Sequence, residues 1–123
     1  MIRGTLIAES LRTDRALDGV PLTVGKIARV GPLGDVGRGQ PPVWTFVEFT
    51  ADETRADELA ASLAEAIDPV GGWYCDFRTE ADTFVVFAEH IFRYPRGDAD
   101  GRRRAASHAE QVGVPAAQID WPE

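Results

Sequence analysis

One stretch of the chain, residues 43–67, most constrains the fold, because a strand pattern passes directly into a helix pattern. Residues 43–50 carry large apolar side chains at both odd and even positions, which is typical of a central strand buried on both faces. Residues 50–53 then have the form of a capping box, whose hydroxyl and carboxylate bind free N–H groups at a helix start. Apolar residues follow at helical spacing and stop before Pro69, which predicts an amphipathic helix over residues 51–67.

Shorter strands and one more helix are predicted on either side of this stretch. Apolar, β-branched and aromatic runs bounded by turn residues indicate strands at residues 4–11, 22–30, 73–78, 83–88 and 91–95. A second helix is expected to begin at Asp98 or Asp100 and to run to Val112. Gly113 then stands where a helix end favours a left-handed residue, and Pro115 follows as a stop.

The resulting order, β-β-β-α-β-β-β-α, favours an α+β fold with a mostly antiparallel sheet and two helices. Strand 43–50, helix 51–67 and strand 73–78 form a split β-α-β unit, and a ferredoxin-like sheet would insert a neighbouring strand between the two. We expect both helices to cover one face of the sheet. The first strands, a long loop or a second subunit would then cover the other face. The 123 residues are expected to form a single domain.

Residues 31–42 form the most irregular segment of the sequence. They contain four glycines and three prolines, which predicts a flexible surface loop. The segment lacks the Lys-Ser/Thr pair of a phosphate-binding loop, and it leads into a strand and not into a helix. We therefore expect no nucleotide site there.

Composition excludes several classes of partner. The net charge of −7 argues against nucleic-acid binding, which needs basic side chains that displace phosphate counterions. No apolar stretch approaches the ~20 residues that cross a bilayer, and the N-terminal segment turns polar at Glu9, so neither a membrane span nor a signal peptide is expected. A single cysteine cannot form an intramolecular disulfide, which favours a reducing compartment. We expect a cytoplasmic protein.

The run from Trp73 to Arg78 is the densest aromatic cluster and contains the one cysteine. Strand alternation places Trp73, Cys75 and Phe77 on one face, where we expect them to be core residues. Nothing nearby in the sequence lowers the pKa of the Cys75 thiol, so a buried hydrophobic role is favoured over a nucleophile.

The alternate side chains of the same run are the best candidates for a site. A phenol, carboxylates and a guanidinium on a rigid sheet can bind a polar ligand or serve acid–base chemistry. A cross-strand salt bridge is the competing interpretation of the same residues. The ligand-binding candidates are Tyr74, Asp76, Arg78, Glu48 and Tyr94.

Metal sites and cofactors are not indicated. His90 and His108 lie far apart in the sequence, and no pair of cysteines or histidines has the spacing of a zinc site. We therefore predict no metal and no cofactor.

Several short motifs resemble a family of small bacterial proteins of unknown function. They span nearly the whole chain and are structural in character. They are Gly4-Thr5-Leu6-Ile7 with Ser10-Leu11, Trp44 with Glu48, Trp73-Tyr74-x-Asp76-Phe77, and Gly113-Val114-Pro115 with Gln118-Ile119-Asp120-Trp121. The resemblance implies a bacterial source and no particular activity.

Two functions remain open at this point. The favoured one is a non-catalytic binding or interaction module, which we expect to form a homodimer. The alternative is a small-molecule-binding protein or an enzyme that uses the polar cluster of Tyr74, Asp76, Arg78 and Glu48. This alternative predicts a concave pocket that holds these groups, with at least one shifted pKa.

Overall fold

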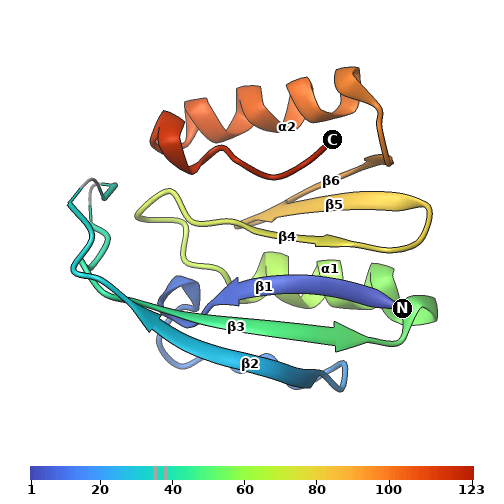
Figure 1. The fold of residues 1–123 in the computed structure, drawn as a ribbon, viewed down its shortest axis with the longest axis horizontal. Coiled ribbons are helices and arrows are strands. Elements are labelled where there is room, and N and C mark those ends of the chain that lie inside the picture. The colour runs from blue at the N-terminus through green and yellow to red at the C-terminus, as the bar shows by residue number, and fades with distance from the viewer. Residues whose placement is uncertain (35, 38) are drawn as a thin grey trace.

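The computed structural model describes residues 1–34, 36–37 and 39–123, and the expected element order is present in it (Figure 1). The strands are β1 (Ile2–Ile7), β2 (Thr23–Val30), β3 (Trp44–Ala51), β4 (Cys75–Arg78), β5 (Asp82–Phe87) and β6 (His90–Pro95). The helices are α1 (Ala56–Ala66) and α2 (Ala99–Gln111), with short 3-10 turns η1 (Ala8–Ser10), η2 (Glu53–Arg55) and η3 (Ala116–Gln118). No helix within these described ranges is long and apolar enough to span a membrane.

All six strands form one antiparallel sheet in the order β2-β3-β1-β4-β5-β6. β1 lies between β3 and β4, the two strands that α1 connects, which is the arrangement predicted for this unit. The α+β class is therefore established. The ferredoxin-like order is not confirmed, because the chain has more strands and a different succession of strands and helices than that β-α-β-β-α-β fold.

The start of α1 differs from the predicted capping box. Thr50 belongs to β3, and the residue that caps the turn before α1 is Asp52, whose carboxylate accepts a hydrogen bond from the Thr54 backbone N–H (3.0 Å). Glu53 instead accepts hydrogen bonds from the N-terminal amino group (2.7 Å) and from the Glu80 N–H (3.0 Å). The box prediction is wrong because the chain makes a 3-10 turn before the α-helix begins.

The two helices cover opposite faces of the sheet, so the prediction that both cover one face is wrong. On β5, Phe84 and Val86 pack in the same core cluster as the α1 leucines, whereas Val85 and Phe87 pack with Ala105 and Ala109 of α2. The physical reason lies in β5 itself. Its last five residues are all buried, so the strand needs a cover on each side.

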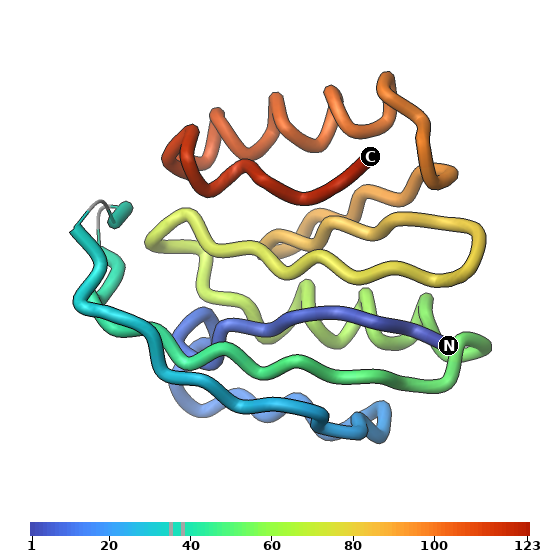
Figure 2. Tube along the Cα trace, viewed as in Figure 1, coloured from blue at the N-terminus to red at the C-terminus, as the bar shows by residue number. Residues whose placement is uncertain are grey.

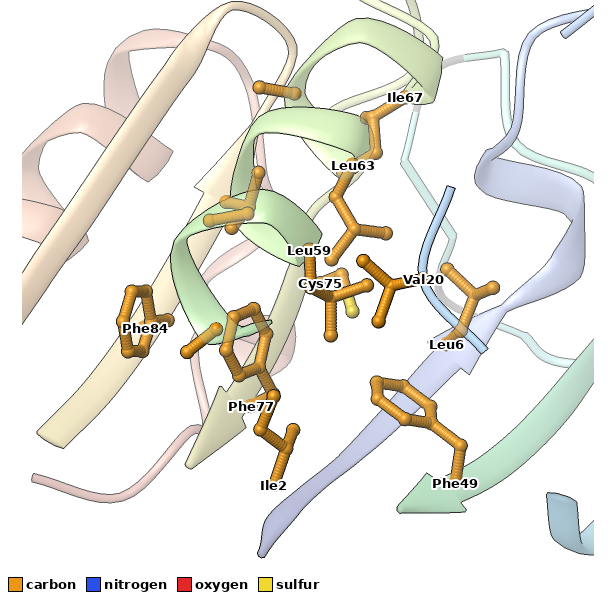
Figure 3. Packing of buried hydrophobic residues seen from close by; sticks show 14 of the residues in the cluster. Ile2, Leu6, Val20, Phe49, Leu59, Leu63, Ile67, Cys75, Phe77 and Phe84 are labelled. Carbon is orange, nitrogen blue, oxygen red and sulfur yellow. The ribbon is translucent and has the colours of Figure 1, made fainter. Parts of the chain in front are cut away.

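The core beneath α1 is built from aromatic and branched side chains of β1, β3, β4 and β5 (Figure 3). Phe77 is fully buried, and its ring stacks on Phe84 with centroids 4.6 Å apart. Gly4 of β1 lies opposite both Phe49 and Phe77, and a Cβ atom there would come within 2.7 Å of each side chain. A glycine is needed at this point because the Phe49 ring and the Cβ atom of Phe77 occupy the space above it.

α2 packs over β5 and β6 together with the C-terminal segment, which we define as residues 116–123. This segment runs back along the sheet below α2 (Figure 2). The Arg102 guanidinium of α2 donates to the carbonyls of Trp121 (2.9 Å) and Ile119 (3.2 Å). Trp121 is 2% exposed, so the segment is an integral part of the core on this side.

The face opposite α1 is covered only in part. α2 and the C-terminal segment lie over β4, β5 and β6, through side chains such as Val85, Phe87 and Tyr94. In Figure 1, α1 lies behind β1, and no helix crosses β1, β3 or β2 on the near side. We call this uncovered part of β1, β2 and β3 the open face.

The predicted loop 31–42 contains no strand or helix in its described part, and residues 35 and 38 lie outside the described residues. Gln40 is buried, and its amide donates to the Gly71 carbonyl (2.6 Å) and bonds with the Gln118 amide (3.3 Å). The end of the loop is thus attached to the C-terminal segment, which the glycine and proline content did not indicate.

Candidate functional site

Four residues from four strands lie in one row on the sheet face opposite α1, and the three on β1, β2 and β3 belong to the open face. Asp76 of β4 is paired with Thr5 of β1, Thr5 with Glu48 of β3, and Glu48 with Lys26 of β2. Directly paired residues of an antiparallel sheet project from the same face. The Lys26 ammonium lies 3.6 Å from the Glu48 carboxylate, so the outer half of the row is charge-paired.

This row lies in a groove of about 820 Å³ that is open to solvent. The open face forms its floor, the C-terminal segment forms one wall, and the start of the 31–42 loop contributes Leu33 and Gly34. Its apolar lining comes from Ile7, Ala28, Val30, Leu33, Trp44, Phe46, Trp73, Ala117, Trp121 and Pro122. A concave, mostly apolar site with a few polar groups is the usual form of a small-molecule site.

Aromatic rings are concentrated around this groove. All three tryptophans of the chain line it, together with Phe46 and Tyr74. Trp44 and Trp73 meet edge to face with centroids 5.4 Å apart, and Tyr74 meets Trp121 in the same way at 5.0 Å. These contacts hold the rings in place, so the groove is formed without a ligand.

Asp76 is the most perturbed acid of the groove. Burial, together with the neighbouring Asp120 carboxylate, raises the pKa of Asp76 from 3.8 to about 6. In the part of the chain that the structure describes, no side chain donates a hydrogen bond to the Asp76 carboxylate. An acid of this kind in a cleft is a candidate functional group.

Tyr74 is held in place by the C-terminal segment. Its hydroxyl donates to Asp120 Oδ1 (3.0 Å) and contacts the Gln118 carbonyl at short distance. Burial and the carboxylates of Asp120 and Asp76 raise the pKa of the Tyr74 phenol, so it stays protonated. Tyr74 therefore acts as a hydrogen-bond donor that fixes the position of Asp120.

The structure brings together three of the five predicted site residues. Tyr74, Asp76 and Glu48 line the groove. Arg78 and Tyr94 are not among its lining residues. Arg78 Nη2 donates to the Glu123 carbonyl (3.2 Å), and the Tyr94 hydroxyl donates to the Pro122 carbonyl (3.3 Å). Both side chains hold the C-terminal segment on the sheet.

Sequence reasoning missed the contributions of the C-terminal segment to the groove, namely Gln118, Asp120 and Trp121. The signal available was Trp121, a large apolar residue in the last positions of the sequence. What could not be read was the side of the sheet on which it docks, because no local pattern encodes that choice.

Cys75 is 1% exposed, as predicted for a core residue, and it lies on the α1 side of the sheet. Its thiol contacts the Thr5 carbonyl (3.4 Å), and burial raises the pKa of this thiol. A buried, protonated thiol is a poor nucleophile, so Cys75 is a core residue.

The two histidines meet although they are distant in sequence. His90 at the start of β6 and His108 of α2 stack with ring centroids 4.4 Å apart. Burial, together with the neighbouring His90, lowers the pKa of His108. Across residues 1–34, 36–37 and 39–123, no group of three or more His, Cys, Asp or Glu side chains is arranged to hold a metal ion.

Comparison with known proteins adds no assignment. No family model matches the chain, and neither a curated protein nor a solved structure shows significant similarity to it. The geometry of the groove therefore has to carry the functional proposal.

Proposed function

We propose that the protein is a non-catalytic binding module that takes a small, largely apolar organic molecule in the groove beside the C-terminal segment. The observation that carries this proposal is the groove itself, about 820 Å³ in volume, lined by three tryptophans and by the partly buried carboxylate of Asp76. Its volume falls within the range of sites that bind drug-sized ligands.

Binding fits the polar groups of the groove better than catalysis. The Tyr74 hydroxyl is occupied by the C-terminal segment, and the Cys75 thiol lies on the other side of the sheet. Asp76, whose pKa is raised to about 6, is then the group left for acid–base chemistry. Recognition needs only apolar contact and one or two fixed polar groups, which this groove supplies.

A fluorescence and thermal-shift screen tests the proposal. Because all three tryptophans line the groove, a bound ligand is expected to change the intrinsic tryptophan emission. A compound that binds the native state also raises the melting temperature, with about 2.7 kcal/mol of stabilisation at a hundred times its Kd. Small aromatic and aliphatic compounds of neutral, cationic and anionic type form the screen.

A pair of phenylalanine variants locates the binding. Ala28→Phe places a ring in the groove and is expected to weaken every hit, whereas Ile27→Phe on the opposite face of β2 is expected to leave the hits unchanged. A screen without any hit, or hits that bind Ala28→Phe as well as the native chain, would contradict the proposal.

The predicted homodimer is a second candidate, favoured by the free outer edge and the exposed apolar side chains of β2. Among the described strands, β2 pairs with β3 alone, so its outer edge is unpaired. Val24 and Ile27 are 49% and 65% exposed on that strand. We propose that a second copy pairs edge to edge with β2, since a free edge strand with exposed apolar side chains is a template for another strand.

Light scattering after size exclusion measures this association. The native chain is expected to elute with twice the mass of one chain, and Ile27→Lys is expected to convert it to a monomer, because a charge at the paired edge opposes association. Ile91→Lys on the opposite edge strand β6 is the matched control, expected to stay dimeric. A monomeric native chain at high concentration would refute the dimer and leave the groove proposal untouched.

A further inference from the structure

We infer that the ligand of the groove is an organic cation, a protonated or quaternary nitrogen attached to a compact apolar body. This inference rests on the proposed function, since it names the ligand class of the same groove. Three features of the groove support a cation, namely its charges, its aromatic lining and the positions of the nearby arginines.

The groove carries more acidic than basic side chains. Three carboxylates, those of Glu48, Asp76 and Asp120, line it. Lys26 is the one basic side chain among its described lining residues, and it pairs with Glu48. Apart from residues 35 and 38, which the structure does not describe, no basic side chain forms an ion pair with Asp76 or Asp120. A cation would supply the missing counter-charge.

The partial burial of Asp76 strengthens the preference. Asp76 is partly removed from water, which is the main reason that its ionised form is disfavoured. A positive ligand close to Asp76 reverses that cost, and the attraction is larger than at a solvated surface because the local dielectric is lower.

The aromatic lining of the groove also favours a cation. Tryptophan and tyrosine rings attract cations through their negative faces, and clusters of such rings are a known way to hold alkylammonium groups. Trp44 and Trp73 bring this property to the same groove as the unpaired carboxylates, whereas the ring of Trp121 already has the Arg102 guanidinium 5.4 Å from its centroid. The body of the ligand then contacts apolar side chains such as Ile7 and Val30.

The nearby arginines make an anion a poor alternative. Arg78 and Arg102 lie close to the C-terminal segment, but their guanidinium groups donate to the carbonyls of Glu123, Trp121 and Ile119. Neither arginine lines the groove. An anionic ligand would meet carboxylates and rings, with Lys26 already paired.

Three compounds of nearly equal shape test the inference, namely phenethylamine, phenethyl alcohol and hydrocinnamate. Tryptophan emission and calorimetry are expected to show that the amine binds at least about tenfold more tightly than the alcohol, which corresponds to about 1.4 kcal/mol. The carboxylate is expected to bind more weakly than the alcohol. If the alcohol or the carboxylate binds as well as the amine, the cation inference is wrong while the groove proposal stands. If none of the three binds and the wider screen is also empty, the proposed function itself fails.

The variant Asp76→Asn tests whether the carboxylate of Asp76 causes the preference for a cation. The variant removes the charge and keeps the shape, so the preference of the amine over the alcohol is expected to fall to about threefold or less while alcohol binding remains. Glu65→Gln removes the same charge from the exposed surface of α1 and is expected to retain the full preference. An unchanged preference in Asp76→Asn would overturn the assignment of the cation to this carboxylate.

Discussion

Replacing Asp76 with asparagine is expected to stabilise the protein by about 3 kcal/mol at pH 7 and above. Burial and the Asp120 carboxylate raise the pKa of Asp76 from 3.8 to about 6, so the ionised form is disfavoured in the folded chain. A tenfold change in the proton affinity of a carboxylate corresponds to about 1.4 kcal/mol. The rise of the Asp76 pKa from 3.8 to about 6 therefore corresponds to about 3 kcal/mol as an upper limit. Denaturant unfolding of the native chain and the variant measures the difference in the free energy of unfolding.

The pH dependence of this gain gives the sharper test. Between about pH 4 and pH 6 the folded native chain binds more protons at Asp76 than the unfolded chain does, so the contribution of Asp76 to stability is full below that window. It is lost as the pH rises through about 6. The advantage of Asp76→Asn should therefore be near zero at about pH 4 and largest above about pH 7.

Glu48→Gln is the control for that experiment. Glu48 lies in the same row of the sheet, but its side chain is half-exposed and paired with Lys26. Its replacement is expected to change the free energy of unfolding by at most about 0.5 kcal/mol. Equal stability of Asp76→Asn and the native chain at pH 8 would show that Asp76 is better solvated than the structure indicates.

Replacing Phe77 with alanine is expected to destabilise the fold by about 3–5 kcal/mol. The Phe77 ring is fully buried beneath α1, stacks on Phe84 and lies over Gly4, so its removal leaves a cavity that these neighbours cannot fill. Such a loss is a large part of the 5–15 kcal/mol that stabilises a typical domain. Thermal and denaturant unfolding measure it.

Two further variants serve as controls for the loss of stability in Phe77→Ala. Phe77→Leu keeps most of the apolar volume and is expected to lose clearly less, and Ile91→Ala, at a side chain that is 45% exposed, is expected to stay within about 0.5 kcal/mol. A loss below about 1 kcal/mol in Phe77→Ala would mean that α1 does not pack on β4 as described.

Asp76→Asn and Phe77→Ala together distinguish an effect on stability from an effect on binding. Phe77 faces α1 and does not line the groove, whereas Asp76, its neighbour in β4, does. A partly buried carboxylate that faces a groove and lowers the stability of the fold is expected of a residue that is retained for function. Asp76→Asn is therefore expected to gain stability and lose the preference for cations together.

Local patterns in the sequence determined most of the secondary structure. The six strands and two helices were predicted in the correct order, because alternation, helical spacing and turn residues act within a few positions of one another. Asp98 caps α2 as proposed, and Gly113 takes the positive φ expected at the end of that helix. Alternation likewise placed Trp73, Cys75 and Phe77 in the core, and all three are buried.

Long-range packing decided the site. Whether α1 and α2 share a sheet face, and where the C-terminal segment docks, depends on contacts between residues far apart in the chain. Through these contacts Arg78 and Tyr94 donate hydrogen bonds to that segment, and Asp120 comes close to Asp76.

The sequence by itself thus determined the elements of this protein and the two faces of β4, because both follow from the geometry of neighbouring residues. The tertiary structure alone decided that Tyr74, Asp76 and Glu48 line a groove and that three tryptophans join them. The physical reason is that a groove exists only where one part of the sheet is covered and the adjacent part is not, and the C-terminal segment sets that boundary.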